Sequence, residues 1–178
     1  MSTRIALVEA VAAFLEEVTT EMRFYARHQK STDEPYLPMT VYRLRLPNAA
    51  EAEKKTPYIL VQYLSSSTSQ TAGRPPETLA VVRLVIAVAN PDTPEGKNSD
   101  DQEGMYVLLE LIDRLHFHLE QQIVLDDAQR DAAVFELCLD EPMEDEIFYS
   151  DTRPYCVGWM TTVWRVGTAT RKDVQALI

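Results

Sequence analysis

Two stretches of the chain repeat their apolar residues at helical spacing. The first carries glutamates mostly on its other side, and its apolar residues are Ile5, Val8, Val11, Ala12, Leu15, Val18 and Met22. Ser2 or Thr3 fits the cap of this helix. The second ends at about Gln122, and the Ser99–Gln102 pair that precedes it fits a capping box. Its apolar side holds Met105, Leu108, Leu109, Ile112, Leu115 and Leu119. The pattern predicts two amphipathic helices.

Five other stretches have the composition and alternation of strands. They cover residues 39–46, 58–64, 78–89, 134–139 and 155–166. In 39–46 the apolar Tyr42, Leu44 and Leu46 alternate with Arg43 and Arg45, which is typical of a half-exposed strand. In 78–89 the even positions from Ala80 to Val88 are all apolar, which predicts a long buried strand.

Polar segments separate these elements. Residues 28–38, 47–57 and 91–101 contain prolines and polar side chains and are expected to be loops. Residues 65–77 hold no large apolar side chain, so we expect a long mobile loop at the tip of a projecting hairpin. A loop of this length is either an unstructured surface segment or a binding element. An acidic irregular link is expected between the last two strands.

The order of these elements predicts an α+β fold. One domain over residues 1–178 would have a mainly antiparallel sheet with two principal helices on one face, in the order α-β-β-β-α-β-β. The last strand carries bulky residues on both sides, Tyr155, Val157, Trp159 and Val163 against Cys156, Met160, Trp164 and Val166. Helices on one side of the sheet alone would leave some of these side chains exposed to solvent, which indicates burial by another subunit.

Charge is distributed unevenly along the chain. The net charge is −11, and residues 91–153 hold four basic and eighteen acidic side chains. Nucleic-acid binding requires clusters of lysine and arginine, so this excess of acidic residues argues against DNA binding. The acidic surface serves either solubility or a specific purpose, which is to repel a polyanion or to meet a basic partner. No apolar run approaches the length of a membrane span.

No residue pattern indicates catalysis, a cofactor or a metal. Asp140, Glu141 and residues 144–146 form an acidic cluster, but it lacks the glycine turn and alternating ligands of a calcium loop. His116 and His118 lie on different sides of a helix and cannot share a metal. Cys138 and Cys156 are interpreted as reduced core residues, with a disulfide between neighbouring strands as the alternative. We therefore expect a protein that is not an enzyme.

Several motifs resemble those of the tail terminator (tail completion) proteins of tailed bacteriophages. The matching pieces are the N-terminal helix, PYILVQY opened by Pro57, TLAVVRLVIAVAN, LLELIDRLHFHL and RPYCVGWMTTVWRV, in this order. The family shows a Pro-Tyr-Ile start to its central strand and a proline followed by an aromatic residue before its last strand. This pattern is matched by residues 57–59, Pro154 and Tyr155. The chain departs from the family in its loops at 28–38 and 47–57 and in its acidic middle.

The resemblance implies a virion protein assembled in the bacterial cytoplasm. It would form a homohexameric ring that caps the tail tube, ends tube polymerisation and joins the tube to a head-completion or neck protein, with DNA passing through without specific binding. The alternatives are another head–tail joining or tube protein, or a cytosolic regulatory or ligand-binding domain. Candidate interaction residues are Ser67, Gln70, Arg74, Tyr149, Tyr155 and Trp159.

Overall fold

The computed structural model describes residues 3–26, 35–47, 56–70, 72, 76–91, 103–126, 134–149 and 154–166. In these residues two helices, α1 (Thr3–Thr19) and α2 (Glu103–Gln121), accompany nine strands. The long strands are β4 (Tyr58–Ser69), β5 (Glu77–Ala89) and β9 (Tyr155–Val166). The short strands are β1 (Phe24–Tyr25), β2 (Tyr36–Leu37), β3 (Thr40–Arg43), β6 (Val124–Asp126), β7 (Val134–Leu137) and β8 (Glu144–Phe148).

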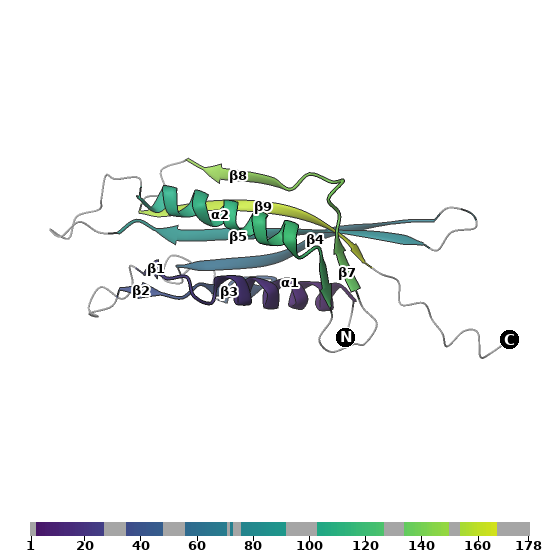
Figure 1. The fold of residues 1–178 in the computed structure, drawn as a ribbon, viewed down its shortest axis with the longest axis horizontal. Helices are drawn as coiled ribbons and strands as arrows, with labels where there is room; N and C mark the ends of the chain where they lie inside the picture. Colours follow the sequence, from purple (N-terminus) through teal and green to yellow (C-terminus); the bar gives the residue numbers. More distant parts are fainter. Residues whose placement is uncertain are drawn as a thin grey trace.

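Seven strands form one curled sheet in the order β3-β4-β5-β9-β7-β6 (Figure 1). Strand β8 lies off this path and pairs with β9. All neighbours in the sheet are antiparallel except β3 and β4, which are parallel. Strands β1 and β2 form a separate two-stranded ribbon. The predicted fold class, α+β with a mainly antiparallel sheet, is confirmed.

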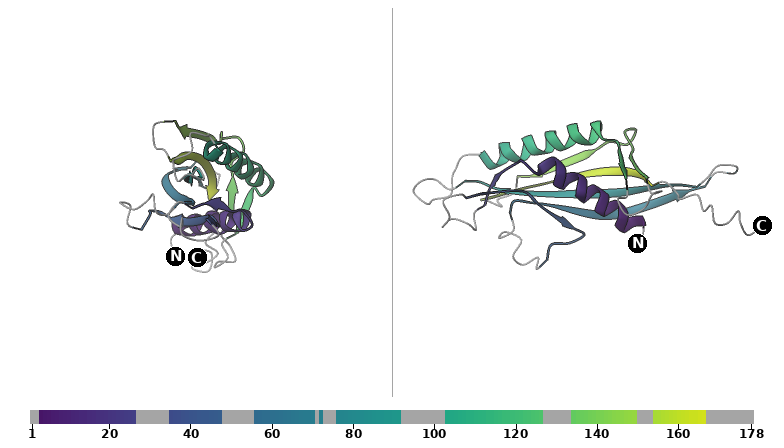
Figure 2. Two further views of the ribbon diagram at one scale, coloured as in Figure 1. Left: turned by 90° about the vertical axis from the view of Figure 1, so that its left-hand side faces the viewer. Right: turned by 60° about the horizontal axis from the view of Figure 1, so that its bottom comes forward.

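Both helices pack on one face of the sheet. Helix α1 contacts β3, β4 and β6, and α2 contacts β5 and β9; Figure 2 shows the two helices at separate positions along the curled sheet. The even residues of β5 and β9 point to this helix-covered face, and they include Leu84, Ile86, Met160 and Trp164, none of which is exposed to solvent. The even apolar positions from Ala80 to Val88 therefore all lie on the buried side of β5.

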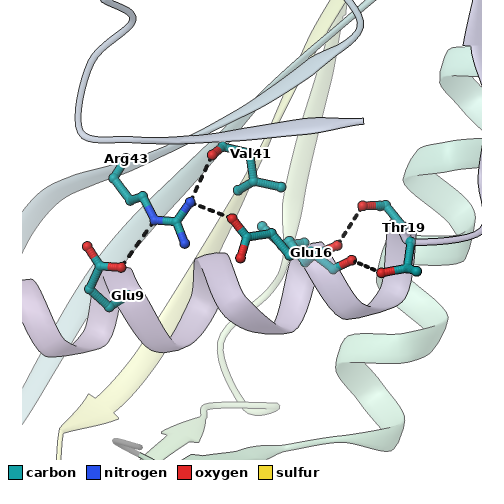
Figure 3. A network of polar contacts seen from close by, with 7 residues as sticks. Glu9, Glu16, Thr19, Val41 and Arg43 are labelled. Carbon is teal, nitrogen blue, oxygen red and sulfur yellow. Dashed lines mark hydrogen bonds and ion pairs between the residues drawn. The ribbon is translucent and has the colours of Figure 1, made fainter. Parts of the chain in front are cut away.

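Strand β3 faces the core with the side opposite to the one that its pattern of apolar residues indicated. Val41 is buried beneath α1, and Tyr42 lies on the opposite face with its ring 6.1 Å from that of Tyr58. Arg43 shares the side of Val41, where it forms ion pairs with Glu9 and Glu16 of α1 (Figure 3). The alternation of apolar residues indicated the reverse orientation. This indication was wrong because two carboxylates of α1 neutralise the arginine. The hydrogen bond with Glu16 is the main cause that raises the pKa of Arg43.

The hairpin of β4 and β5 is longer than predicted. Residues 65–69 belong to β4 and pair with residues 77–81, after a bulge between Tyr63 and Ser65. The predicted extent of the loop, residues 65–77, was wrong because backbone pairing does not require apolar side chains. The hydroxyls of Thr68 and Thr78 lie 3.0 Å apart across the two strands. The hairpin extends beyond the helices, as expected for a projecting tip (Figure 1).

Other short elements lie inside segments expected to be irregular. Strand β2 falls within the predicted loop at 28–38, and β8 falls within the predicted acidic link. On α2, Leu111 is buried and Leu109 is 38% exposed, so one apolar position of the predicted helix face was wrong. The Ser99–Gln102 pair lies outside the described residues. The N–H of Gly104 instead donates to the side-chain oxygen of buried Asn90, which ties the start of α2 to the end of β5.

Candidate interaction surface

The second face of the sheet has neither α1 nor α2 over it. We call it the helix-free face, and it is formed by the even residues of β4 before its bulge, the odd residues of β5 and β9, and Glu144, Glu146 and Phe148 of β8. The strand register aligns one row of side chains across five strands: Tyr42, Leu60, Val85, Trp159 and Glu146. A second row contains Tyr58, Ala87, Val157 and Phe148.

The centre of the helix-free face is apolar and largely dry. Tyr58, Leu60 and Ala87 are buried and form a second cluster, separate from the main core, with Tyr42, Leu46, Val85 and Val157 packed against them. Burial raises the pKa of the Tyr58 hydroxyl. Part of the helix-free face is therefore shielded from solvent, whereas Phe148 at its border is 38% exposed.

An arginine and a tryptophan stand beside this cluster. The guanidinium carbon of Arg83 lies 4.7 Å from the ring centroid of Trp159, within the range of a cation–π contact. The Nε of Arg83 is buried and has no hydrogen-bond partner among the described residues. No ion pair joins Arg83 to a carboxylate in the part of the chain that the structure describes. A buried donor without a partner is uncommon in folded proteins, and a carboxylate or carbonyl of a partner would satisfy it.

The candidate residues from the sequence do not gather at one site. Trp159 lies in the middle of the helix-free face, and Tyr155 begins β9 opposite Ala89. Tyr149 follows β8 and is 76% exposed. Ser67 lies in the projecting hairpin, opposite Leu79, and Leu79 pairs with Arg165.

Arg165 therefore marks the position of Ser67 along the sheet, and it lies ten residues after Tyr155 on β9. Ten residues correspond to roughly 33 Å at the usual rise of a strand. Gln70 is exposed just beyond β4. Arg74 lies outside the described residues. The structure thus places the candidates in two separate regions, the hairpin end with Ser67 and Gln70, and the sheet centre and opposite end with Trp159, Tyr155 and Tyr149.

Sequence reasoning missed Arg83. A signal was present, because this arginine interrupts the apolar residues of 79–89 and its odd position places it opposite the buried side of β5. The partner strand could not be identified from the sequence, so the contact with Trp159 was not predictable. A charged residue within an apolar strand is a useful indicator of a second, functional face.

The acidic cluster is divided between two sides of a strand. Glu144 and Glu146 of β8 point to the helix-free face, and Asp145 points to α2, where its Oδ1 lies 3.5 Å from Nε2 of His116. The described residues contain no group of three or more acidic, histidine or cysteine side chains that could hold a metal ion. The alternation of the strand explains this, since neighbouring carboxylates point in opposite directions.

The two cysteines are buried free thiols. Burial is the main cause that raises the pKa of both Cys138 and Cys156. The N–H of Cys138 donates to the carbonyl of Val163, seven positions along β9 from Cys156. Such a separation corresponds to roughly 23 Å along a strand, so the alternative of a disulfide within one chain is excluded. Thiols of this kind are poor nucleophiles.

A groove of about 750 Å³ lies between the two helices. Val18 and Glu21 of the α1 end line it, together with Arg114, His118 and Gln121 of α2. It is open to solvent. None of its described lining residues has a buried polar atom without a hydrogen-bond partner, so the groove is a weaker candidate than the helix-free face.

No protein-family model matches this chain, and no similar sequence is found among curated proteins. Among the described residues there is no helix with the length and apolar character of a membrane span.

Proposed function

We propose that this protein is a structural subunit of a bacteriophage or phage-like tail, of the tail terminator kind. Six copies form a ring that caps the tail tube, ends its polymerisation and provides the joint to a head-completion or neck protein. The proposal rests on the sequence resemblance and on an architecture suited to binding other subunits. It assigns the protein no catalytic activity and no cofactor.

The helix-free face is the observation that carries this proposal. Its dry centre at Tyr58, Leu60 and Ala87 is bordered by the partly exposed Trp159 and by Arg83, whose Nε has no partner in the described chain. Partly exposed aromatic residues and arginine are enriched in protein interfaces. A neighbouring subunit that covers this face would bury Trp159 and provide an acceptor for Arg83.

A ring needs two different surfaces on each subunit, since a heterologous contact closes a cycle. The helix-free face lies on the side of the sheet opposite α1 and α2, so the two sides of one subunit differ in shape and chemistry. The helix-covered side carries exposed carboxylates such as Glu17 of α1, which would meet an arginine of the next copy. This asymmetry supports a head-to-tail arrangement.

The projecting hairpin is assigned to contact with the tail tube. Ser67 and Gln70 are exposed at its end, beyond the part of the sheet that the helices cover. Because strand pairing continues to Ser69 and Glu77, the hairpin presents its hydroxyls on an ordered backbone. Deletion within it should leave the fold and the ring intact and prevent joining to the tube.

The overall charge fits a ring through which DNA passes without binding. With a net charge of −11, the subunit repels phosphate and lacks the cationic clusters that hold a duplex. The purified protein should therefore not bind duplex DNA even at low salt. Retention of DNA by the assembled ring at low salt would contradict this part of the proposal.

The test is the solution mass of the protein combined with negative-stain imaging. A ring of six has about six times the 20.3 kDa mass of one chain and a visible central hole. A stable monomer or dimer across a wide concentration range would contradict the proposal and favour a cytosolic regulatory or ligand-binding domain. The addition of ring to purified tail tubes should also stop their elongation.

A further inference from the structure

Among the described strands of the curled sheet, β8 has a free edge. Strand β8 pairs with β9 through all five of its residues, from Glu144 opposite Thr161 to Phe148 opposite Val157. Its other side has no partner strand within the described ranges, and no further backbone hydrogen bond from this strand is present there. An edge of this kind presents a row of backbone N–H and C=O groups that a further strand can bind.

The outward carbonyls of β3, one of the other two end strands, are already occupied. In β3, the N–H groups of Thr40 and Leu44 bond toward the β4 side, so the carbonyls of Val41 and Arg43 point outward. The Arg43 side chain donates to the Val41 carbonyl at 3.0 Å, and the Arg45 N–H donates to the Arg43 carbonyl at 2.7 Å. Leu44 has a φ of 64°, which ends the strand in a tight turn.

Strand β6 is also a poor edge for a partner. It has three residues, Val124–Asp126, and its central Leu125 is buried in the main core. Helix α1 contacts this strand. The contrast among the three ends makes β8 the edge at which the sheet can grow.

The side chains of β8 are directed mostly to solvent. Only Ile147 packs inward, against Gly158 and near Ile112 of α2, whereas Glu144, Asp145, Glu146 and Phe148 are exposed. Tyr149 follows directly and is also exposed. The strand therefore combines free backbone groups, three consecutive carboxylates and two accessible aromatic rings.

We propose that the free edge of β8 binds an extended, lysine-rich segment of another protein, which adds to the sheet as a further strand. Backbone hydrogen bonds would provide affinity, and alternate side chains would provide specificity. Basic side chains on one side of the added strand would lie opposite Glu144 and Glu146, and the aliphatic stem of the next basic side chain on that side would contact Phe148. The inference rests on the sheet edge alone and does not require the ring.

Charge selects the occupant. Two copies of β8 paired edge to edge would bring carboxylates opposite one another, which destabilises strand pairing. The closed β3 edge with its internally paired Arg43 offers no complementary strand from a second copy either. A basic segment of a different protein meets both requirements, free backbone groups and positive charge.

The experiment uses a fluorescein-labelled nine-residue peptide in which lysine alternates with valine or threonine, titrated against the whole protein at low salt. The test variant is Glu144→Lys with Glu146→Lys. The matched control is Asp113→Lys with Glu120→Lys, which makes the same charge change at exposed positions of α2. We expect the test variant to weaken binding about tenfold or more, since two attractive cross-strand pairs become repulsive, and the control to stay near wild type.

Two further measurements distinguish strand addition from general attraction between charges. The same peptide with two of its central valine or threonine residues replaced by proline should bind far more weakly, because proline removes the donors that pair strands. Amide hydrogen exchange in β8 should slow when the alternating peptide is bound. Should the double reversal unfold the protein, Glu144→Gln with Glu146→Gln should still weaken binding measurably.

Equal weakening by the test and control variants would overturn the proposal, as would equal binding of the proline peptide. Absence of any binding by the alternating peptide would also overturn it. A change in self-association caused by Glu144→Lys with Glu146→Lys, without a change in peptide binding, would assign the edge to contacts between copies instead. The solution mass of the wild-type protein is measured separately, so failure of the ring leaves this result interpretable.

Discussion

The two faces of the sheet are formed by alternate residues of the same strands, yet they differ in what protects them from water. On the helix-covered face, Trp164 is fully buried beneath the helices and its Nε1–H donates to Thr162 at 2.8 Å. On the helix-free face, Trp159 is half-buried and its neighbour Arg83 has a donor without a partner. One face is complete within a single chain, and the other has the composition of an unfinished interface.

The largest expected effect separates the two tryptophans. Trp164→Ala should lower the free energy of unfolding by about 3–5 kcal/mol, since it removes a large side chain from the core. Trp159→Ala should cost no more than about 1–2 kcal/mol in dilute solution, because partial burial and one cation–π contact are lost. Urea denaturation of both variants provides the measurement. Equal losses would show that the two faces contribute equally to the core of one subunit.

The second prediction concerns Gly158, which lies on the helix-covered face of β9. A β-carbon built there would be 2.9 Å from Cδ1 of Ile147 and 3.2 Å from the carbonyl oxygen of Glu146. Gly158→Val should therefore cost about 1–3 kcal/mol, and Ile147→Ala in the same chain should recover part of the loss. A double-mutant cycle in thermal unfolding tests this. Strict additivity would mean that β8 does not lie on β9 as the structure has it.

Two adjacent threonines provide a finer comparison of the faces. The hydroxyl of Thr162 accepts from Trp164 and donates to the carbonyl of Val82, and Thr161 points to the helix-free face. Thr162→Val leaves a buried indole N–H without its acceptor and should cost about 1–3 kcal/mol. Thr161→Val should change the free energy of unfolding by less than about 0.5 kcal/mol. The opposite order of the two losses would contradict the assignment of faces.

The smallest expected effect is at alkaline pH. Burial raises the pKa of Tyr58 above its ordinary value of 10.0, so the folded protein disfavours the phenolate. This contribution to stability is fully present below the unfolded-state pKa and is lost as pH rises through it toward the folded-state pKa. Tyr58→Phe should make the alkaline fall in stability shallower, with Cys138 and Cys156 retained in both proteins. Identical pH profiles would show that the centre of the helix-free face is wet.

Much of the architecture was predictable because it depends on local periodicity. The helical spacing of Leu108, Ile112 and Leu115 identified α2, and the even apolar positions of β5 identified its buried side. The hairpin residues 65–69 were not recognised as a strand because their stability comes from backbone pairing with residues 77–81, which leaves no apolar pattern. Strand β8 was missed for a similar reason, since its charged residues face solvent and only Ile147 packs inward.

The candidate site was less accessible to sequence reasoning. Trp159 was identified because β9 is apolar on both sides, which is a local property. The contact of Arg83 with Trp159 depends on the register between β5 and β9, where Val85 pairs with Trp159, and this register is a tertiary property. The orientation of β3 was misjudged because the partners of Arg43 lie in α1, some thirty residues earlier in the chain.

The central claim is that the helix-free face is the contact between subunits of a ring. Sedimentation of the wild-type protein, Trp159→Ser and Phe117→Ser tests it most directly, because Phe117 is an equally apolar residue that is 56% exposed on α2. The account predicts six-fold mass for the wild type and for Phe117→Ser, and a folded monomer for Trp159→Ser. A six-fold assembly that persists in Trp159→Ser, or a wild-type protein that remains a monomer, would contradict it.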